Sequence, residues 1–157
     1  MAISVSNELT RAFEAEEAEQ LSEIIRRKKR EDFETLRRLV LAGPDVNEAH
    51  RQKAIYALGR WGDAGVIGDI ERILPQLAEP GRIAAIDALG RLGTQRALEV
   101  IAQYEQDPSA QVRKLVVEAC NRIGGTKAEG RLRTIARDDP EEWIRKLALK
   151  RLEGHIR

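Results

Sequence analysis

The chain has little of several things that usually indicate a function. Of its 157 residues only one is a cysteine, Cys120, so no disulfide can form within the chain. Aromatic residues make up only 4%, which leaves few of the residues that favour β-strands. The formal net charge is +1, so there is no overall positive field to attract nucleic acid or a membrane surface.

Segments that would place the chain in a membrane or outside the cell are missing as well. No apolar run approaches the roughly 18 residues that a membrane-spanning helix needs. Residues 1–5 lack the charged and apolar regions of a secretion signal. We therefore expect a soluble protein of the cytoplasm with no membrane partner.

What the sequence does contain is self-similarity at a fixed period. The stretch AAIDALGRLG at 84–93 matches KAIYALGRWG at 53–62 and VVEACNRIG at 116–124. A period of about 31 residues is typical of folds in which one small helical unit stacks on the next. The sequence therefore predicts a repeat protein, and the scarcity of strand formers predicts an all-α one.

Apolar residues spaced near 3.6 residues apart predict two helices in each repeat, joined by a glycine-containing turn. The expected first helices cover 47–60, 81–91, 110–122 and 141–152, and the expected second helices cover 65–78, 95–106 and 127–138. Pro75 falls inside the first of these second helices and should kink it. The last repeat stops after its first helix, which gives about three and a half helical hairpins.

The N-terminal region does not follow this period. The pattern predicts one helix that starts at Asn7 and ends in the basic run Arg26–Arg30, and a second helix over 32–42. Terminal units of repeat proteins are commonly atypical because one of their faces meets water. We therefore interpret residues 1–46 as an N-terminal helical cap and residues 47–157 as one continuous repeat array.

Two columns of equivalent residues run through the repeats. Leu58, Leu89 and Cys120 share one apolar position, so we expect all three to be buried and the thiol to be inert. The other column is Arg51, Arg82, Arg113 and Arg145, which recur at intervals of 31, 31 and 32 residues. One interpretation is functional, with these guanidinium groups binding phosphates or carboxylates of a partner. The favoured interpretation is structural, with each arginine bonding a linker carboxylate or a helix carbonyl.

These motifs resemble the short bacterial HEAT repeats, often called phycobilisome-lyase-type HEAT-like repeats. The resemblance rests on the pattern AIxALGRxG at 54–62 and 85–93, and on Val-Arg and Ile-Arg at 112–113 and 144–145. It implies a right-handed α-solenoid whose second helices line the concave side. Members of the family include chromophore lyase subunits and regulatory adaptors, so the resemblance is specific for the fold and weak for the function.

Catalytic chemistry has no visible carrier in the sequence. There is no P-loop, no zinc-protease helix motif, no nucleophile elbow and no calcium loop. The two histidines, His50 and His155, stand at opposite ends of the repeat array, which argues against a shared metal site. We expect no catalytic residue, no metal and no cofactor.

We therefore predict a non-catalytic adaptor that binds another protein or a peptide on the concave face, and that is itself a monomer or a weak homodimer. The expected binding residues lie on the second helices, opposite their apolar stripes: Arg72, Gln76, Glu99, Gln103, Arg133 and Arg137. Two alternatives stay open. One is a chromophore lyase-like component. The other is a nucleic-acid-binding protein that uses the concave arginines and the basic run Arg26, Arg27, Lys28, Lys29 and Arg30, although the favoured interpretation of this run is a solvated helix end.

Overall fold

The computed structural model describes residues 11–12 and 18–155 of the chain. These residues form nine α-helices, two short 3₁₀ helices and no β-strand. The α-helices are α2 (Ala18–Arg27), α3 (Arg30–Leu41), α4 (Glu48–Trp61), α5 (Ile67–Ile73), α6 (Glu79–Leu92), α7 (Gln95–Ala102), α8 (Ala110–Ile123), α9 (Gly125–Asp138) and α10 (Glu142–His155). The 3₁₀ helices η1 (Ala64–Val66) and η2 (Leu74–Gln76) flank α5.

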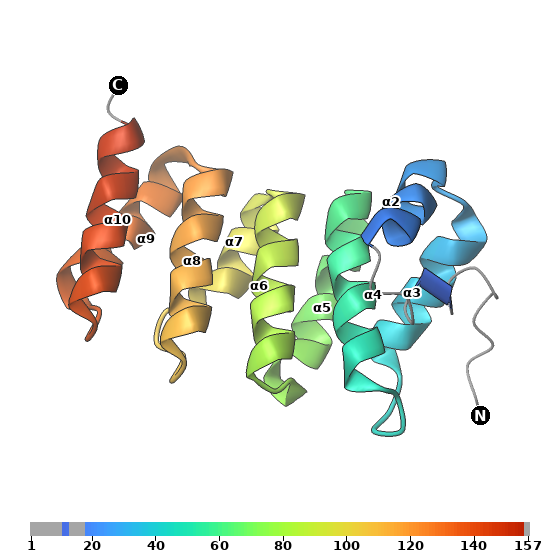
Figure 1. Cartoon of the computed structure of the whole chain (residues 1–157). Helices are drawn as coiled ribbons and strands as arrows, with labels where there is room; N and C mark the ends of the chain where they lie inside the picture. The colour runs from blue at the N-terminus through green and yellow to red at the C-terminus, as the bar shows by residue number, and fades with distance from the viewer. Residues whose placement is uncertain (1–10, 13–17, 156–157) are drawn as a thin grey trace.

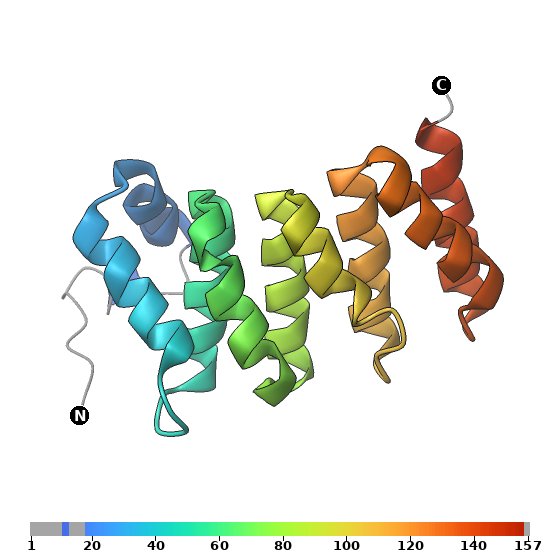
Figure 2. The same cartoon turned by 180° about the vertical axis from the view of Figure 1, so that it is seen from behind.

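The helices stand in two rows that run along the molecule. The row of first helices contains α4, α6, α8 and α10, which Figure 1 shows side by side in chain order. The row of second helices contains α5, α7 and α9 and faces the viewer in Figure 2. Neighbouring first helices pack directly against one another, whereas neighbouring second helices make far fewer contacts. This arrangement confirms the predicted all-α solenoid of helical hairpins.

Residues beside the helices explain where several of them begin and end. The side chains of Asn47, Thr94 and Ser109 accept hydrogen bonds from backbone N–H groups in the first turns of α4, α7 and α8. Gly62 and Gly93 follow α4 and α6 in the left-handed conformation, with φ of 81° and 69°. Glycine adopts this conformation at little cost, which is why it recurs at the turn of each repeat.

Two predictions about the second helices are wrong in extent. The helix expected over 65–78 ends at Ile73, and Leu74–Gln76 forms the separate 3₁₀ turn η2. Pro75 therefore ends the helix instead of kinking it, because its ring lacks an N–H donor and crowds the preceding turn. The helix expected over 95–106 ends already at Ala102.

The basic run also differs from the expectation. It does not end a single helix, because α2 stops at Arg27 and α3 begins at Arg30. Lys28 adopts a φ of 49°, which turns the chain between the two helices. The predicted start of the first helix at Asn7 lies outside the described residues.

The hydrophobic core is one continuous cluster that extends through the stack. Leu58, Leu89 and Cys120 each have 0% of their surface exposed, which confirms the predicted core column. At the N-terminal end, the ring of Phe33 in α3 lies 5.5 Å from that of Trp61 in α4. The helices α2 and α3 thereby extend the stack beyond the first repeat.

The arginine column forms the predicted ladder between repeats. Arg82 donates Nε and Nη2 to the carboxylate of Asp107 at 2.8 and 3.0 Å, and Arg113 donates the same atoms to Asp139 at 2.9 and 3.3 Å. Each carboxylate lies in the linker that leads to the following repeat. Arg113 and Arg145 also donate to backbone carbonyls of their own linkers. These charge-assisted bonds occupy the guanidinium groups structurally.

Arg51 closes the ladder differently at its N-terminal end. The residue equivalent to Asp107 one repeat earlier is Gln76, which is exposed. Arg51 donates instead to the carbonyl oxygens of Val40, Ala42 and Gly43, at 3.3, 2.9 and 3.0 Å. The first repeat is therefore tied to the end of α3 by carbonyl groups and not by a carboxylate.

Candidate partner-binding surface

The six residues predicted to bind a partner are all exposed. They follow the row of second helices, and we call them the second-helix surface: Arg72 on α5, Gln76 in η2, Glu99 on α7, Gln103 directly after α7, and Arg133 and Arg137 on α9. None of them takes part in the hydrophobic core. These residues are far apart in the sequence, but the helices that carry them form one row (Figure 2).

The charges on this surface are partly neutralised within the chain. Arg133 lies 3.4 Å from Glu129, and Arg137 makes a two-pronged contact of 2.7 Å on each side with Asp138. The hydrogen bonds from Arg137 hold the pKa of the Asp138 carboxyl below its usual range. The surface is therefore less basic at its C-terminal end than Arg133 and Arg137 alone would make it. Sequence spacing alone did not show the Arg137 pair, because neighbouring residues on a helix need not face each other.

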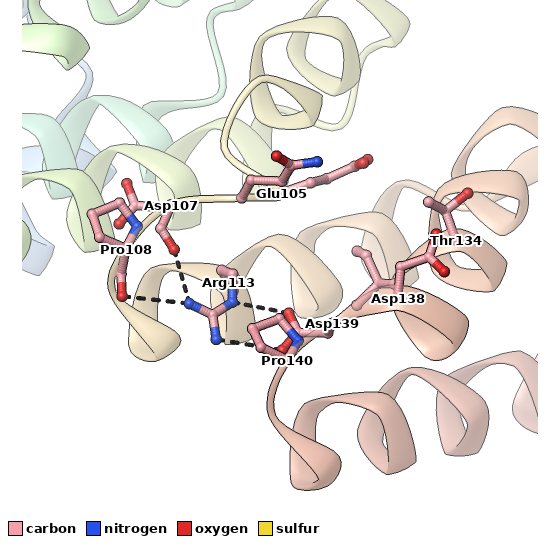
Figure 3. Close-up of a pocket in the computed structure, with 10 residues that line it drawn as sticks. Glu105, Asp107, Pro108, Arg113, Thr134, Asp138, Asp139 and Pro140 are labelled. Atoms are coloured by element: carbon pink, nitrogen blue, oxygen red, sulfur yellow. Dashed lines mark hydrogen bonds and ion pairs between the residues drawn. The ribbon is translucent and has the colours of Figure 1, made fainter.

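A cleft of about 480 Å³ opens between the carboxyl ends of α7 and α9. Figure 3 shows its walls, which are made by the segment after α7, the two linkers, Arg113 of α8 and the last turns of α9. The lining residues are Glu105, Gln106, Asp107, Pro108, Arg113, Thr134, Ile135, Asp138, Asp139 and Pro140. The sequence predicted that Arg113 bonds a linker carboxylate or a helix carbonyl, but it did not show that this ladder lies beside a cleft.

Glu105 is the chemically unusual residue of this cleft. Its side chain is 13% exposed, and Arg131 is the nearest cation, with Nε 3.6 Å from Oε1. That distance is too long for a hydrogen bond, and the buried Oε1 accepts none from the described residues. Burial raises the pKa of the Glu105 carboxyl, while the charge of Arg131 acts in the opposite direction. A buried acceptor without a donor is costly, so this carboxyl is suited to receive one from a ligand.

The basic run is also exposed, but acidic neighbours accompany it. Arg27 donates Nε to Glu23 at 3.0 Å, and Arg26 pairs with the same carboxylate. Arg30 lies 2.9 Å from Glu34. These pairs lower the positive potential that the run would offer to a phosphate backbone.

The other residues considered from the sequence show no catalytic arrangement. Burial raises the pKa of the Cys120 thiol to about 12, so it stays protonated. His155 contacts Asn121 at 2.9 Å near the C-terminal end. Among the described residues, no three His, Cys, Asp or Glu side chains are grouped as metal ligands would be. In that same part of the chain, no helix has both the length and the apolarity that crossing a membrane requires.

The stacked helical hairpins define an α-solenoid with a cleft between two of its repeats. Residues 70–153, more than half of the chain, match the model of the HEAT repeats, so the chain belongs to that family. This confirms the resemblance stated from the sequence motifs. No curated protein matches the sequence.

One solved structure with this fold is the complex of CpcE and CpcF of phycocyanin lyase from Nostoc sp. PCC7120. The likeness has a TM-score of 0.66 at 16% sequence identity, and it covers 98% of this chain and 66% of that chain. The present chain thus spans just under two thirds of the length of that subunit. At this identity the likeness concerns the fold.

Proposed function

We propose that the chain is a non-catalytic adaptor that binds a protein or peptide on the second-helix surface, which the family resemblance predicts to be concave. The apolar stripes of the helices are buried in the core, and Arg82 and Arg113 of the arginine column bond the linker carboxylates. The residues of the second-helix surface have neither of these tasks. They are contiguous only in the folded stack, as expected of a surface that recognises one extended partner.

The observation that carries this proposal is the cleft between α7 and α9. A concave site with few, well-placed polar groups is the usual form of a binding site. Here the distinctive group is Glu105, whose buried oxygen lacks a donor among the described residues. A lysine or arginine side chain of the partner would supply that donor and would be held by the acidic lining, while Gln103 and Arg137 would contact the flanking backbone.

The test compares capture of a partner by two tagged variants of equal net charge. In the first, Arg133→Glu and Arg137→Glu reverse two charges on α9. In the control, Lys146→Glu and Lys150→Glu reverse two charges on α10. We expect the first variant to retain at most about a tenth of the partner retained by the wild type, because Arg133 and Arg137 would face acidic groups of a partner of mixed charge, and like charges at an interface repel strongly. The control variant should retain it nearly fully.

Melting temperatures of both variants should stay within a few degrees of the wild type, since the changed residues are exposed. Equal capture by the two variants would contradict the proposed surface. If capture survives both changes and is lost when residues 1–30 are removed, the N-terminal helices are the binding site instead.

The fold favours one second candidate, a component of a chromophore lyase. The similarity to a subunit of the phycocyanin lyase complex extends over 98% of this chain. The purified chain would be mixed with the colourless phycocyanin polypeptide and the free chromophore, and attachment would be followed by visible absorbance. Attachment that depends on this chain would replace the adaptor proposal, and no attachment would leave the lyase candidate without support.

Nucleic-acid binding is the least favoured function of the three. The ion pairs of the basic run with Glu23 and Glu34 leave few guanidinium groups for phosphates. We propose further that the chain acts in the cytoplasm without a cofactor, as a monomer or a weak homodimer.

A further inference from the structure

A second column of arginines lies on the row of first helices. Arg60, Arg91 and Arg122 recur every 31 residues and stand exposed near the carboxyl ends of α4, α6 and α8. Together with Arg26 of α2 they surround another cleft of about 480 Å³, which we call the arginine cleft. Its remaining lining is Ser22, Ile25, Gly59 and Gly62.

One carboxylate joins two members of this column. Asp87 of α6 accepts a hydrogen bond from Nε of Arg91 on its own helix at 2.8 Å, and one from Nη1 of Arg122 on α8 at 3.3 Å. Arg122 reaches back across Gly90, where an added Cβ would lie 3.7 Å from Nη1. The repeat geometry thus forms a slot for one carboxylate between successive arginines.

One repeat earlier, the same slot contains no carboxylate. The residue equivalent to Asp87 is Tyr56, and the guanidinium of Arg60 lies over its ring at 4.7 Å. Within the described part of the chain Arg60 makes no ion pair, and the two terminal nitrogens of Arg91 donate no hydrogen bond. The slot between Arg60 and Arg91 therefore has two guanidinium groups and lacks the anion that completes the next slot.

Two glycines, Gly59 and Gly62, line part of the arginine cleft. Gly59 packs so closely on α6 that a Cβ in its place would lie 2.7 Å from Cα of Ala88, so the backbone there is held in place. Gly62 has nothing within 4 Å of where its Cβ would be. Because Gly62 has no side chain, this part of the arginine cleft stays accessible to a side chain from outside.

We propose that the arginine cleft binds an acidic side chain of a protein partner. The carboxylate of this side chain lies between Arg60 and Arg91, just as the carboxylate of Asp87 lies between Arg91 and Arg122. Two guanidinium groups can hold one carboxylate through several charge-assisted hydrogen bonds. A single carboxylate matches one slot, whereas a continuous phosphate backbone would also have to pass Glu23 and Asp87, which lie beside the cleft and would repel it. The arginine cleft is separate from the second-helix surface, so this inference does not depend on the proposed function.

The test uses a dye-labelled acetylated hexaglutamate peptide as the probe, with binding followed by fluorescence anisotropy at about 50 mM and about 150 mM salt. The wild-type chain should bind it saturably. Arg60→Gln combined with Arg91→Gln should weaken binding at least about tenfold, since it removes both sides of the slot.

A matched pair of variants at Tyr56 sharpens the test. Tyr56→Asp supplies the missing carboxylate from within the chain, so it should also weaken binding about tenfold although every arginine remains. Tyr56→Asn has nearly the same shape without the charge and should bind the probe within about threefold of the wild type. If the double arginine variant does not fold, this exposed position still decides the question.

Three outcomes would overturn the inference. The first is the absence of saturable binding by the wild-type chain. The second is equal affinity of the Tyr56→Asp and Tyr56→Asn variants. The third is a labelled oligothymidylate that binds more tightly than hexaglutamate at about 150 mM salt and is lost on changing Arg60 and Arg91, which would make the cleft a phosphate site. The variants at Arg133 and Arg137 serve as a control, because they should bind the probe like the wild type.

Discussion

Cys120 is a residue whose burial the repeat predicts correctly. It occupies the position of Leu58 and Leu89, and all three side chains are fully buried. Burial raises the pKa of its thiol to about 12, and the negative charge of Glu105 acts in the same direction. The thiolate is the reactive form of cysteine, so this residue packs the core and takes no part in nucleophilic chemistry.

The raised pKa has a consequence for stability at alkaline pH. The thiol of the unfolded chain ionises near its ordinary pKa of 9.0, whereas the folded one stays protonated until about 12. Its contribution is therefore fully present below pH 9 and is lost as the pH rises toward 12. When the pH rises from 9 to 11, the free energy of unfolding of the wild type should fall by roughly 2 kcal/mol more than that of Cys120→Ala, because the variant has no thiol to ionise. Urea denaturation at each pH measures this difference. Parallel pH profiles of the two proteins would contradict the buried, protonated thiol.

Arg60 is a residue whose surroundings the sequence motif does not predict. It is part of the repeated motif from which the fold was predicted, and so is its equivalent Arg91. Its importance depends on Tyr56, which replaces the carboxylate that Asp87 provides one repeat later. Only the packing of neighbouring helices shows which residues of different repeats share a slot, so the sequence motif did not identify the arginine cleft.

At the scale of helices, small residues set how closely the first helices approach. An added Cβ at Gly59 would meet Cα and Cβ of Ala88 at 2.7 Å, and one at Gly90 would meet Cβ of Ala119 at 2.8 Å. The glycine of the motif is thus a packing residue, and a larger one would push neighbouring helices apart. The sequence marked this glycine as repeated but gave no indication of which atoms face it.

We expect Gly59→Ala to destabilise the protein by about 1–3 kcal/mol, the usual cost of overpacking a tight contact. The matched control is Gly130→Ala in the middle of α9, where an added Cβ meets nothing within 4 Å. There alanine should stabilise the protein by up to about 1 kcal/mol, because it favours the helix more than glycine does. Chemical denaturation of both variants measures the difference. Equal effects of the two substitutions would show that the close contact between α4 and α6 has no energetic weight.

At the scale of the whole molecule, the period of the sequence predicted the number, type and order of the helical hairpins. It could not predict the clefts, because a cleft depends on how far α7 and α9 diverge and on which side chains fill the space between them. It also overestimated two of the three second helices, because α5 ends before Pro75, which cannot continue the helical hydrogen bonds, and α7 ends at Ala102. A stack of this kind has contacts mainly between neighbouring repeats, so its stability is approximately the sum of local terms.

This additivity makes destabilisation local at the end of the stack. Ile144 of α10 and Leu89 of α6 are both fully buried, so replacing either by alanine should cost roughly 2–5 kcal/mol. For Ile144→Ala we expect hydrogen exchange to accelerate at least about tenfold in α9 and α10, while α4 and α6 keep their protection, because only neighbouring repeats share contacts. For Leu89→Ala, in the middle of the array, protection should fall on both sides of α6. If Ile144→Ala accelerated exchange equally in all helices, the stack would unfold as one cooperative unit. A partner bound at either cleft would then stabilise the whole chain and not only the repeats that it contacts.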